Sequence, residues 1–123
     1  GLSYTRFAYS SLKLSHTRIS DKDSFTASIE LTNVGDREGT EVVQLYIRDI
    51  YSSATRPVKE LKDFARVTLK PGEKKTVTFT VTPDKLAYWN RNMQYGVEKG
   101  EFEIMIGSSS QDKDLKKVKM EVL

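Results

Sequence analysis

The side chains that could do chemistry are dispersed along the chain, and no motif gathers them. There is a single histidine, His16, and there is no cysteine. A serine hydrolase needs its histidine held between a serine and a carboxylate, and a catalytic zinc ion usually has about three protein ligands. His16 falls between an expected strand and the turn at Asp21-Lys22-Asp23, where we expect an exposed loop histidine. These residues argue against a catalytic triad, a thiol nucleophile and a zinc site.

Carboxylates are plentiful, but nothing isolates a pair of them. A glycosidase needs two carboxyl groups that face each other across a sugar. Four glutamates fall at outward positions of expected strands and four aspartates fall in turns: Glu30, Glu41, Glu101, Glu103, Asp36, Asp49, Asp63 and Asp84. Asp21-x-Asp23 and Asp112-x-Asp114 could suggest calcium, but both lack the glycine and distant glutamate of an EF-hand loop, so we interpret each as a turn. We expect no catalytic residue, no metal and no cofactor.

Aromatic residues raise a carbohydrate-binding hypothesis, because sugars stack on exposed rings. The candidates are Tyr46, Tyr51, Tyr88, Trp89 and Tyr95. Ring pairs at positions i and i+2 of one strand face would favour a sugar platform, and the sequence has no convincing example. Tyr88 and Trp89 could instead plug one end of the fold or pack against a neighbouring domain, and both interpretations stay open.

Length and charge place further limits on the function. A chain of 123 residues is the size of one domain. The balance of 20 basic against 17 acidic residues is too even to suggest nucleic acid. No apolar run approaches the roughly 20 residues that cross a bilayer, and no charged region followed by an apolar one indicates a signal peptide. We therefore expect one domain that binds neither nucleic acid nor membrane.

The elements that must position these side chains are strands, because apolar residues recur with period two. In the stretch 25–32, Phe25, Ala27, Ile29 and Leu31 are expected to point inward. Similar stretches are expected at 7–14, 41–48, 58–69, 76–81, 100–107 and 115–122. The alternation slips at Lys62-Asp63, which predicts a bend or bulge.

Turn signals separate many of these strands. Lys70-Pro71-Gly72-Glu73 has proline and glycine in type II positions. Residues 82–89 predict one helical turn, with Thr82 as N-cap and Pro83 at the first helical position. The sequence shows no alternation of strands and helices, which argues against a parallel sheet. The sequence therefore predicts an all-β, immunoglobulin-like (fibronectin type III-like) β-sandwich of about seven or eight strands, as a single domain over 1–123.

Segments from nearly the whole chain are similar, in order and spacing, to one known module. They are Gly1-Leu2-Ser3-Tyr4-Thr5-x-Phe7, Asn33 to Tyr46, Arg56 to Phe64, Leu69 to Glu73 with Val77-x-Phe79, Glu98-x-Gly100-Glu101-Phe102, and Ile106 to Ser110. Together they resemble the C-terminal fibronectin type III-like domain of family 3 glycoside hydrolases, the β-glucosidases and β-xylosidases. Glycine is more usual in that family at the position of Asp63.

The resemblance implies a non-catalytic accessory domain that braces the catalytic domains of the same polypeptide. In that family the nucleophilic aspartate lies in a barrel domain and the acid/base carboxylate in an α/β domain, so no catalytic residue carries over. It also implies excision from the C-terminus of a longer glycosidase and a periplasmic or secreted location.

In some members of that family, loops of the module approach the active-site rim, where oligo- or polysaccharide binds. We expect Tyr4, Arg56, Pro57 and Trp89 to contact the missing domains. An independent carbohydrate-binding module and an adhesion module remain the alternatives.

Overall fold

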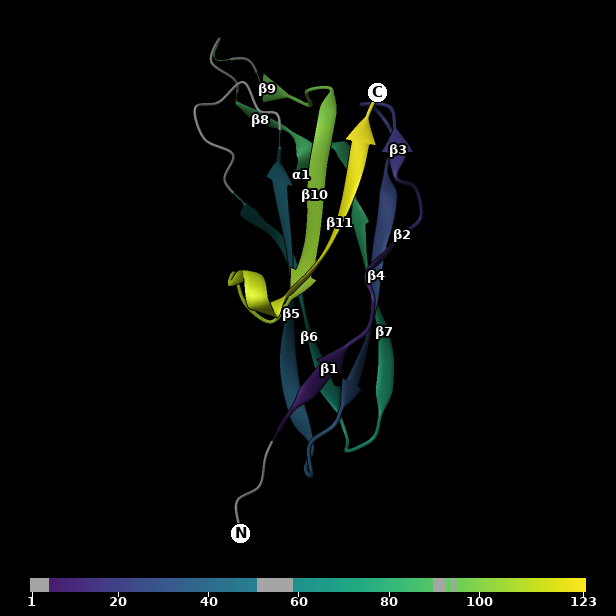
Figure 1. Ribbon diagram of the computed structural model, residues 1–123, viewed down its shortest axis with the longest axis vertical. Coiled ribbons are helices and arrows are strands. Elements are labelled where there is room, and N and C mark those ends of the chain that lie inside the picture. Colours follow the sequence, from purple (N-terminus) through teal and green to yellow (C-terminus); the bar gives the residue numbers. More distant parts are fainter. Residues whose placement is uncertain (1–4, 51–58, 90–92, 94) are drawn as a thin grey trace.

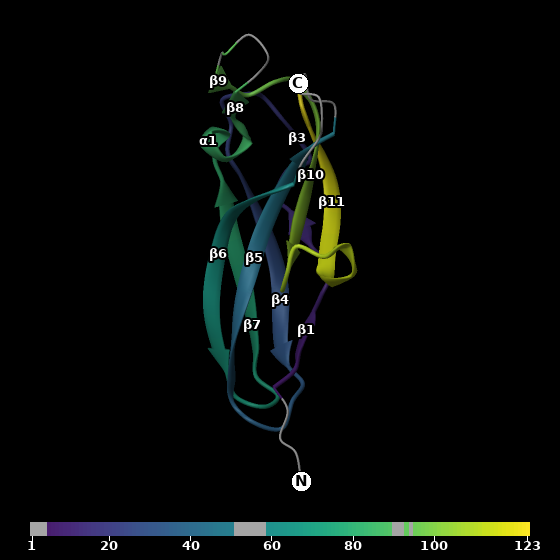
Figure 2. The ribbon, with the colours of Figure 1, turned by 90° about the vertical axis from the view of Figure 1, so that its left-hand side faces the viewer.

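The alternating apolar residues are arranged in two packed layers of strands. The computed structural model describes residues 5–50, 59–89, 93 and 95–123. Within them, seven strands have three or more residues and four have two. Figures 1 and 2 show two sheets facing each other, with a small hairpin at one end. The expected all-β sandwich is therefore confirmed.

The smaller sheet is built around one long strand, β4 (Phe25–Asn33). β7 (Lys74–Val81) pairs antiparallel along one side of it. Two short strands, β1 (Phe7–Tyr9) and β2 (Lys13–Leu14), share the other side. The alternation predicted for β4 is confirmed, because Phe25, Ala27, Ile29 and Leu31 are all buried.

The larger sheet has the order β3-β11-β10-β5-β6. Its long members are β5 (Gly39–Asp49), β6 (Glu60–Leu69), β10 (Gly100–Gly107) and β11 (Leu115–Val122). Figure 2 shows β6, β5, β10 and β11 side by side in this order. β6 forms one edge of the sheet, and β3 (Arg18–Ile19), at the other edge, pairs in parallel with β11.

The core lies between the two sheets and takes side chains from both. It is the largest contiguous apolar cluster of the described residues, and such burial is the main favourable contribution to folding. Its fully buried members include Ala27, Leu31, Val43, Leu45, Val81, Ile104 and Ile106. Two polar residues are buried in the described part of the chain, Asn33 and Glu103.

The single strand predicted over 7–14 is wrong, because the structure divides it. Residues 7–9 pair with β4 in one register, and residues 13–14 pair one residue out of that register. The extra residue is a bulge, which turns Leu12 into the core. The Ser10 hydroxyl accepts the main-chain N–H of Glu30 at 2.8 Å, and Ser15 does the same for Thr26. Serine side chains thus complete the ladder of β4.

The turn prediction is confirmed, and the predicted helical turn is present but shorter than expected. Gly72 has φ of +80°, and the N–H of Glu73 bonds the carbonyl of Lys70 at 2.9 Å, as a type II turn requires. The helix α1 (Pro83–Leu86) begins with proline, but the Thr82 side chain makes no capping hydrogen bond.

Three short elements that the sequence did not indicate follow α1. Residues 88–89, which were expected to end the helical turn, form β8 (Tyr88–Trp89) instead. This strand pairs with β9 (Tyr95–Gly96). A short 3₁₀ helix, η1 (Asp112–Asp114), lies between β10 and β11. No helix in the described part of the chain is long and apolar enough to span a membrane.

Candidate functional site

The outer face of β5 and β6 carries large apolar side chains that the sandwich leaves exposed. Val42, Leu61 and Phe64 are 37%, 51% and 59% exposed, respectively. Antiparallel pairing places the outward residues of the two strands opposite one another: Val42 with Arg66, Gln44 with Phe64, and Tyr46 with Leu61. We call Val42, Leu61 and Phe64 the apolar patch.

A bulge in β6 is what brings two members of the patch to one face. Leu61 and Phe64 are three residues apart, so regular alternation would put them on opposite faces of the strand. The register shifts by one residue at Lys62, because Asp63 pairs with Leu45 and Leu61 pairs with Tyr46. The predicted irregularity at Lys62-Asp63 is confirmed, and the slip in alternation was the sequence signal for the patch.

The same bulge gives Asp63 a structural partner. Its carboxylate lies 3.1 Å from Nζ of Lys85. Lys85 belongs to α1, which follows β7 of the smaller sheet, so this ion pair joins the two layers beside the β6 edge. A glycine at position 63, as the family resemblance suggests, would lack this contact.

The outer face of the smaller sheet differs in chemistry. Its outward residues on β4 and β7 pair as Thr26 with Thr80, Ser28 with Thr78, Glu30 with Thr76 and Thr32 with Lys74. Hydroxyl and charged groups of this kind are readily solvated. The exposed large apolar side chains on the faces of the two sheets therefore belong to the larger sheet.

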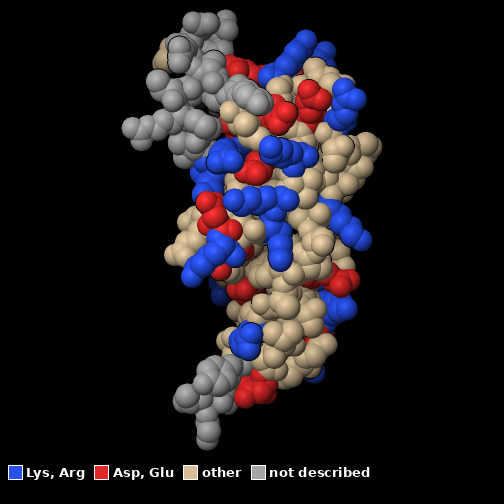
Figure 3. Space-filling model, in the orientation of Figure 1, with Lys and Arg blue, Asp and Glu red and all other residues tan. Residues whose placement is uncertain are grey.

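Charged side chains occupy much of the remaining outer face of the larger sheet. Figure 3 shows Lys and Arg gathered across its middle, interspersed with Asp and Glu. Nη2 of Arg48 lies 2.7 Å from Oε1 of Glu103, the residue directly opposite on β10. Glu103 lies at the outward position expected for it, but it is only 8% exposed. A carboxylate can be buried at this position because the arginine pairs with it.

The loop between β10 and β11 closes over one part of this face. It covers a second small cluster made of Tyr46, Met105 and Leu115. The side-chain amide of Gln44 donates to the carbonyl of Ser108 at 3.0 Å, and its oxygen accepts a hydrogen bond from the Tyr46 hydroxyl. These contacts hold the loop against the sheet.

Asp112 and Asp114, which could have suggested calcium, have separate structural partners. Asp112 lies 2.7 Å from Nζ of Lys59 and 3.2 Å from Nζ of Lys117. These hydrogen bonds and positive charges hold the pKa of Asp112 below its ordinary value. Asp114 accepts a hydrogen bond from Ser109 instead. The described residues contain no cluster of three potential metal ligands.

His16 lies in an exposed loop, as predicted. Its Nδ1 is 3.1 Å from Oγ of Ser15. That hydroxyl already accepts the N–H of Thr26, so the serine completes the hydrogen-bond ladder of β4. This arrangement is structural and does not resemble a serine–histidine nucleophile.

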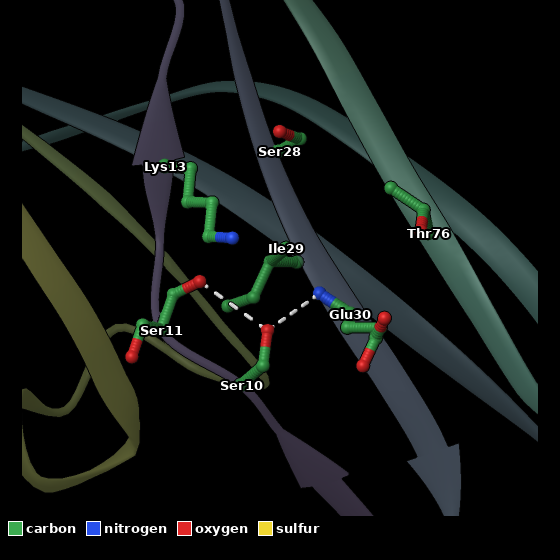
Figure 4. A pocket seen from close by; sticks show the side chains of 7 residues that line it. All are labelled: Ser10, Ser11, Lys13, Ser28, Ile29, Glu30 and Thr76. Carbon is green, nitrogen blue, oxygen red and sulfur yellow. Dashed lines mark hydrogen bonds between the residues drawn. The ribbon is translucent and has the colours of Figure 1, made fainter.

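A polar groove of about 310 Å³ opens beside the bulge between β1 and β2. Figure 4 shows the Ser10 hydroxyl bonded to the N–H of Glu30 and to the carbonyl of Ser11. Lys13, Ser28, Ile29 and Thr76 complete the lining. No aromatic ring lines this groove, which lies wholly within the described residues, so it offers no surface on which a sugar could stack.

The predicted contact residues lie wholly or partly outside the described residues. Tyr4, Arg56 and Pro57 lie outside the described residues. The backbone of Trp89 forms part of β8, but its side chain is also outside the described part. Their role in contacting other domains therefore stays a prediction. The apolar patch was not among the predicted contact residues.

Comparison with known proteins identifies the family. The model of the fibronectin type III-like domain matches residues 41–110, which run from β5 to the loop after β10. The chain belongs to this family. The match spans the patch-bearing strands β5 and β6 as well as β7, α1 and β10.

Relatives and solved structures agree with the resemblance derived from the sequence. The chain is 47% identical to a periplasmic beta-glucosidase of Salmonella typhimurium, over 89% of this domain and 14% of the relative. It is 48% identical to a beta-xylosidase of Formosa agariphila, over 99% of this domain and 17% of the relative. A crystal structure of beta-glucosidase from Listeria innocua with glucose superposes with a TM-score of 0.88 at 34% identity, over 99% of this domain and 16% of that chain. This fibronectin type III-like domain thus spans about a sixth of these proteins.

Proposed function

We propose that this chain is the non-catalytic C-terminal accessory domain of a longer β-glycosidase of the β-glucosidase type, in which it braces the catalytic domains. The observation that carries the proposal is the unequal coverage of the matches. Almost all of this chain matches β-glucosidases and β-xylosidases, yet it spans only 14% and 17% of two such relatives. The remaining length of such a protein is ample for separate catalytic domains.

The state of the carboxylates supports a non-catalytic role. Glu103 is paired with Arg48, and Asp112 is held by Lys59 and Lys117. Glu41 accepts a hydrogen bond from the Tyr9 hydroxyl at 3.1 Å. Within the described residues these carboxylates contribute to structure, and none of them lines the polar groove beside β1 and β2.

A periplasmic or secreted location goes with this proposal. The Salmonella relative is described as periplasmic, and a domain without cysteine folds in an oxidising compartment without mispaired disulfides. The partners would be the catalytic domains of the same polypeptide, with oligo- or polysaccharide near the active-site rim.

The test compares the longer polypeptide with a version that lacks residues 1–123. Hydrolysis of aryl β-glucoside and aryl β-xyloside is measured, together with the rate of thermal inactivation. We expect activity in the longer polypeptide, faster inactivation without the accessory domain, and no hydrolysis by residues 1–123 alone. Hydrolysis by residues 1–123 alone, or unchanged inactivation after their removal, would overturn the proposal.

The alternative modules make a different prediction for the domain by itself. Residues 1–123 can be run in native gels that contain soluble β-glucan, xylan or cellulose derivatives. Retardation that depends on the polysaccharide would favour a carbohydrate-binding module. Unretarded migration is the result expected for a domain that acts through its neighbours.

A further inference from the structure

The apolar patch has the composition of a surface that is covered in the working protein. Three large apolar side chains are exposed within two adjacent strands, at positions where a strand facing water usually carries polar residues. β6 is also an edge strand, and edges of this kind are usually protected by charge, by bulges or by a covering segment. A bulge that turns both Leu61 and Phe64 outward is unfavourable if that face stays in water.

Arg66 adds a positive charge to this surface, which a docked partner has to match. It is exposed on the patch face, directly opposite Val42. Two other cations of the larger sheet are paired, since Arg48 contacts Glu103 and Lys117 contacts Asp112. Arg66 makes no ion pair with any described residue. The guanidinium group is well suited to a partly desolvated pair with a carboxylate.

These observations, together with the proposed function on which this step rests, define an interaction surface. We propose that Val42, Leu61, Phe64 and Arg66 form the docking surface through which this domain packs against another domain of the same polypeptide. The facing surface is apolar, and it carries a carboxylate within reach of Arg66.

The small size of the patch favours a neighbour in the same chain over a second copy. Independent partners usually bury about 800 Å² each to associate stably, and three side chains with one arginine provide only part of that area. A tethered neighbour is present at an effective concentration of roughly millimolar, so a small contact suffices. The relatives contain about six times as much chain as this domain, which supplies such a neighbour.

The solved relatives support docking without rearrangement. The Listeria innocua β-glucosidase contains a domain with nearly the same backbone, at a TM-score of 0.88. The outward orientation of the β5 and β6 side chains is set by that backbone. Docking would then require little change in the backbone of the domain.

The experiment uses the longer polypeptide with the double substitution Leu61→Thr/Phe64→Thr. Threonine keeps the preference for strand structure while it removes most of the apolar surface. The matched control is Val34→Thr, because Val34 is 51% exposed but lies in the loop between β4 and β5, away from the patch. Calorimetry and thermal inactivation of glycosidase activity are the measurements, and residues 1–123 alone test folding.

We expect the double variant to unfold in two separate transitions and to inactivate about tenfold faster, as is usual for loss of central contact residues. Val34→Thr should behave as the unsubstituted protein. The melting temperature of residues 1–123 alone should be unchanged by the double substitution, because both side chains are exposed there. Arg66→Glu should accelerate inactivation in the same direction through charge repulsion.

The outcomes separate this inference from the proposed function. If removal of the whole domain accelerates inactivation but the double variant and Arg66→Glu do not, the accessory role stands and this docking surface is wrong. If removal of the domain has no effect, the proposed function itself fails and the docking surface with it. If the double variant melts earlier even as residues 1–123 alone and Arg66→Glu has no effect, the side chains serve folding, which also overturns the inference.

Discussion

The side-chain amide of Asn33 donates a 2.8 Å hydrogen bond to the main-chain carbonyl of Leu69, which ties the end of β4 to the end of β6. The same amide group donates to the carbonyl of Arg37 at 3.0 Å. Its oxygen accepts the N–H of Gly35 at 2.9 Å. The Asn33 side chain is completely buried, and its bond to Leu69 is shielded from water. One side chain therefore joins the two sheets and shapes the loop between β4 and β5.

Replacing this asparagine should be among the most costly polar substitutions in the domain. Asn33→Ala removes the partner of the buried carbonyl of Leu69 and of the half-buried groups at Arg37 and Gly35, and we expect a loss of about 2–3 kcal/mol. Urea unfolding at neutral pH measures the change. Asn33→Asp keeps the acceptor for Gly35 but replaces the donor, so it should be destabilised at least as much. A loss below about 0.5 kcal/mol in both variants would contradict this account.

Gly107 is required by the close approach of the chain to itself. A β-carbon at this position would collide with the carbonyl oxygen of Asp114 and would lie 2.8 Å from the carbonyl carbon. Because both atoms belong to the main chain, Gly107→Ala should cost at least about 2 kcal/mol. Gly96→Ala is the control, because a β-carbon there meets no atom within 4 Å. Equal melting temperatures for the two variants would contradict this prediction, because they would show that the loop between β10 and β11 shifts at little cost.

Tyr9 couples stability to alkaline pH. Burial and the adjacent Glu41 carboxylate raise the pKa of its hydroxyl well above the ordinary value. Because the folded-state pKa is raised, the stabilisation that the Tyr9 hydroxyl contributes is complete below about pH 10. It is lost as the pH rises beyond that value. Tyr9→Phe should be about 1 kcal/mol less stable at pH 7. The difference between the two proteins should shrink above pH 10, as measured by urea unfolding, and a constant difference would refute the coupling.

Asp112 should show a depressed pKa in an NMR titration of its carboxyl carbon. Hydrogen bonds from Lys59 and Lys117 are the main cause. A depressed folded-state pKa stabilises the protein above the ordinary aspartate range, and this is lost as the pH falls through the lower folded value. The effect should be small, because the side chain is 73% exposed. Lys59→Gln and high salt should each raise the pH midpoint of the Asp112 titration, whereas Lys113→Gln should change that midpoint less.

The long strands β4 and β7 were predictable because one face of each meets the core and the other meets water. In β4 and β7 one face lies against the core and the other is more exposed, and alternation in the sequence reports that directly. The type II turn at Lys70–Glu73 was predictable for a local reason, since Gly72 supplies the positive φ. Neither feature depends on which distant segment becomes the neighbour.

The short elements were not predictable from periodicity. β3 has two residues and exists because Arg18 and Ile19 lie beside Glu121 and Val122, more than 100 residues away. The division of the first strand depends on a one-residue bulge opposite β4. Two residues are too few to form a pattern, and the bulge becomes visible only when the register on both sides is known.

The sequence by itself determined the all-β class, the inward faces of the main strands and the family to which the domain belongs. It also indicated the irregularity at Lys62-Asp63. Only the tertiary structure decided that this irregularity turns Leu61 and Phe64 to one exposed face, and that Glu103 is buried against Arg48. The physical reason is that alternation records whether a side chain meets the core or the outside. What an outward side chain meets, whether water, a charged partner or another domain, depends on which strands pair and in what register.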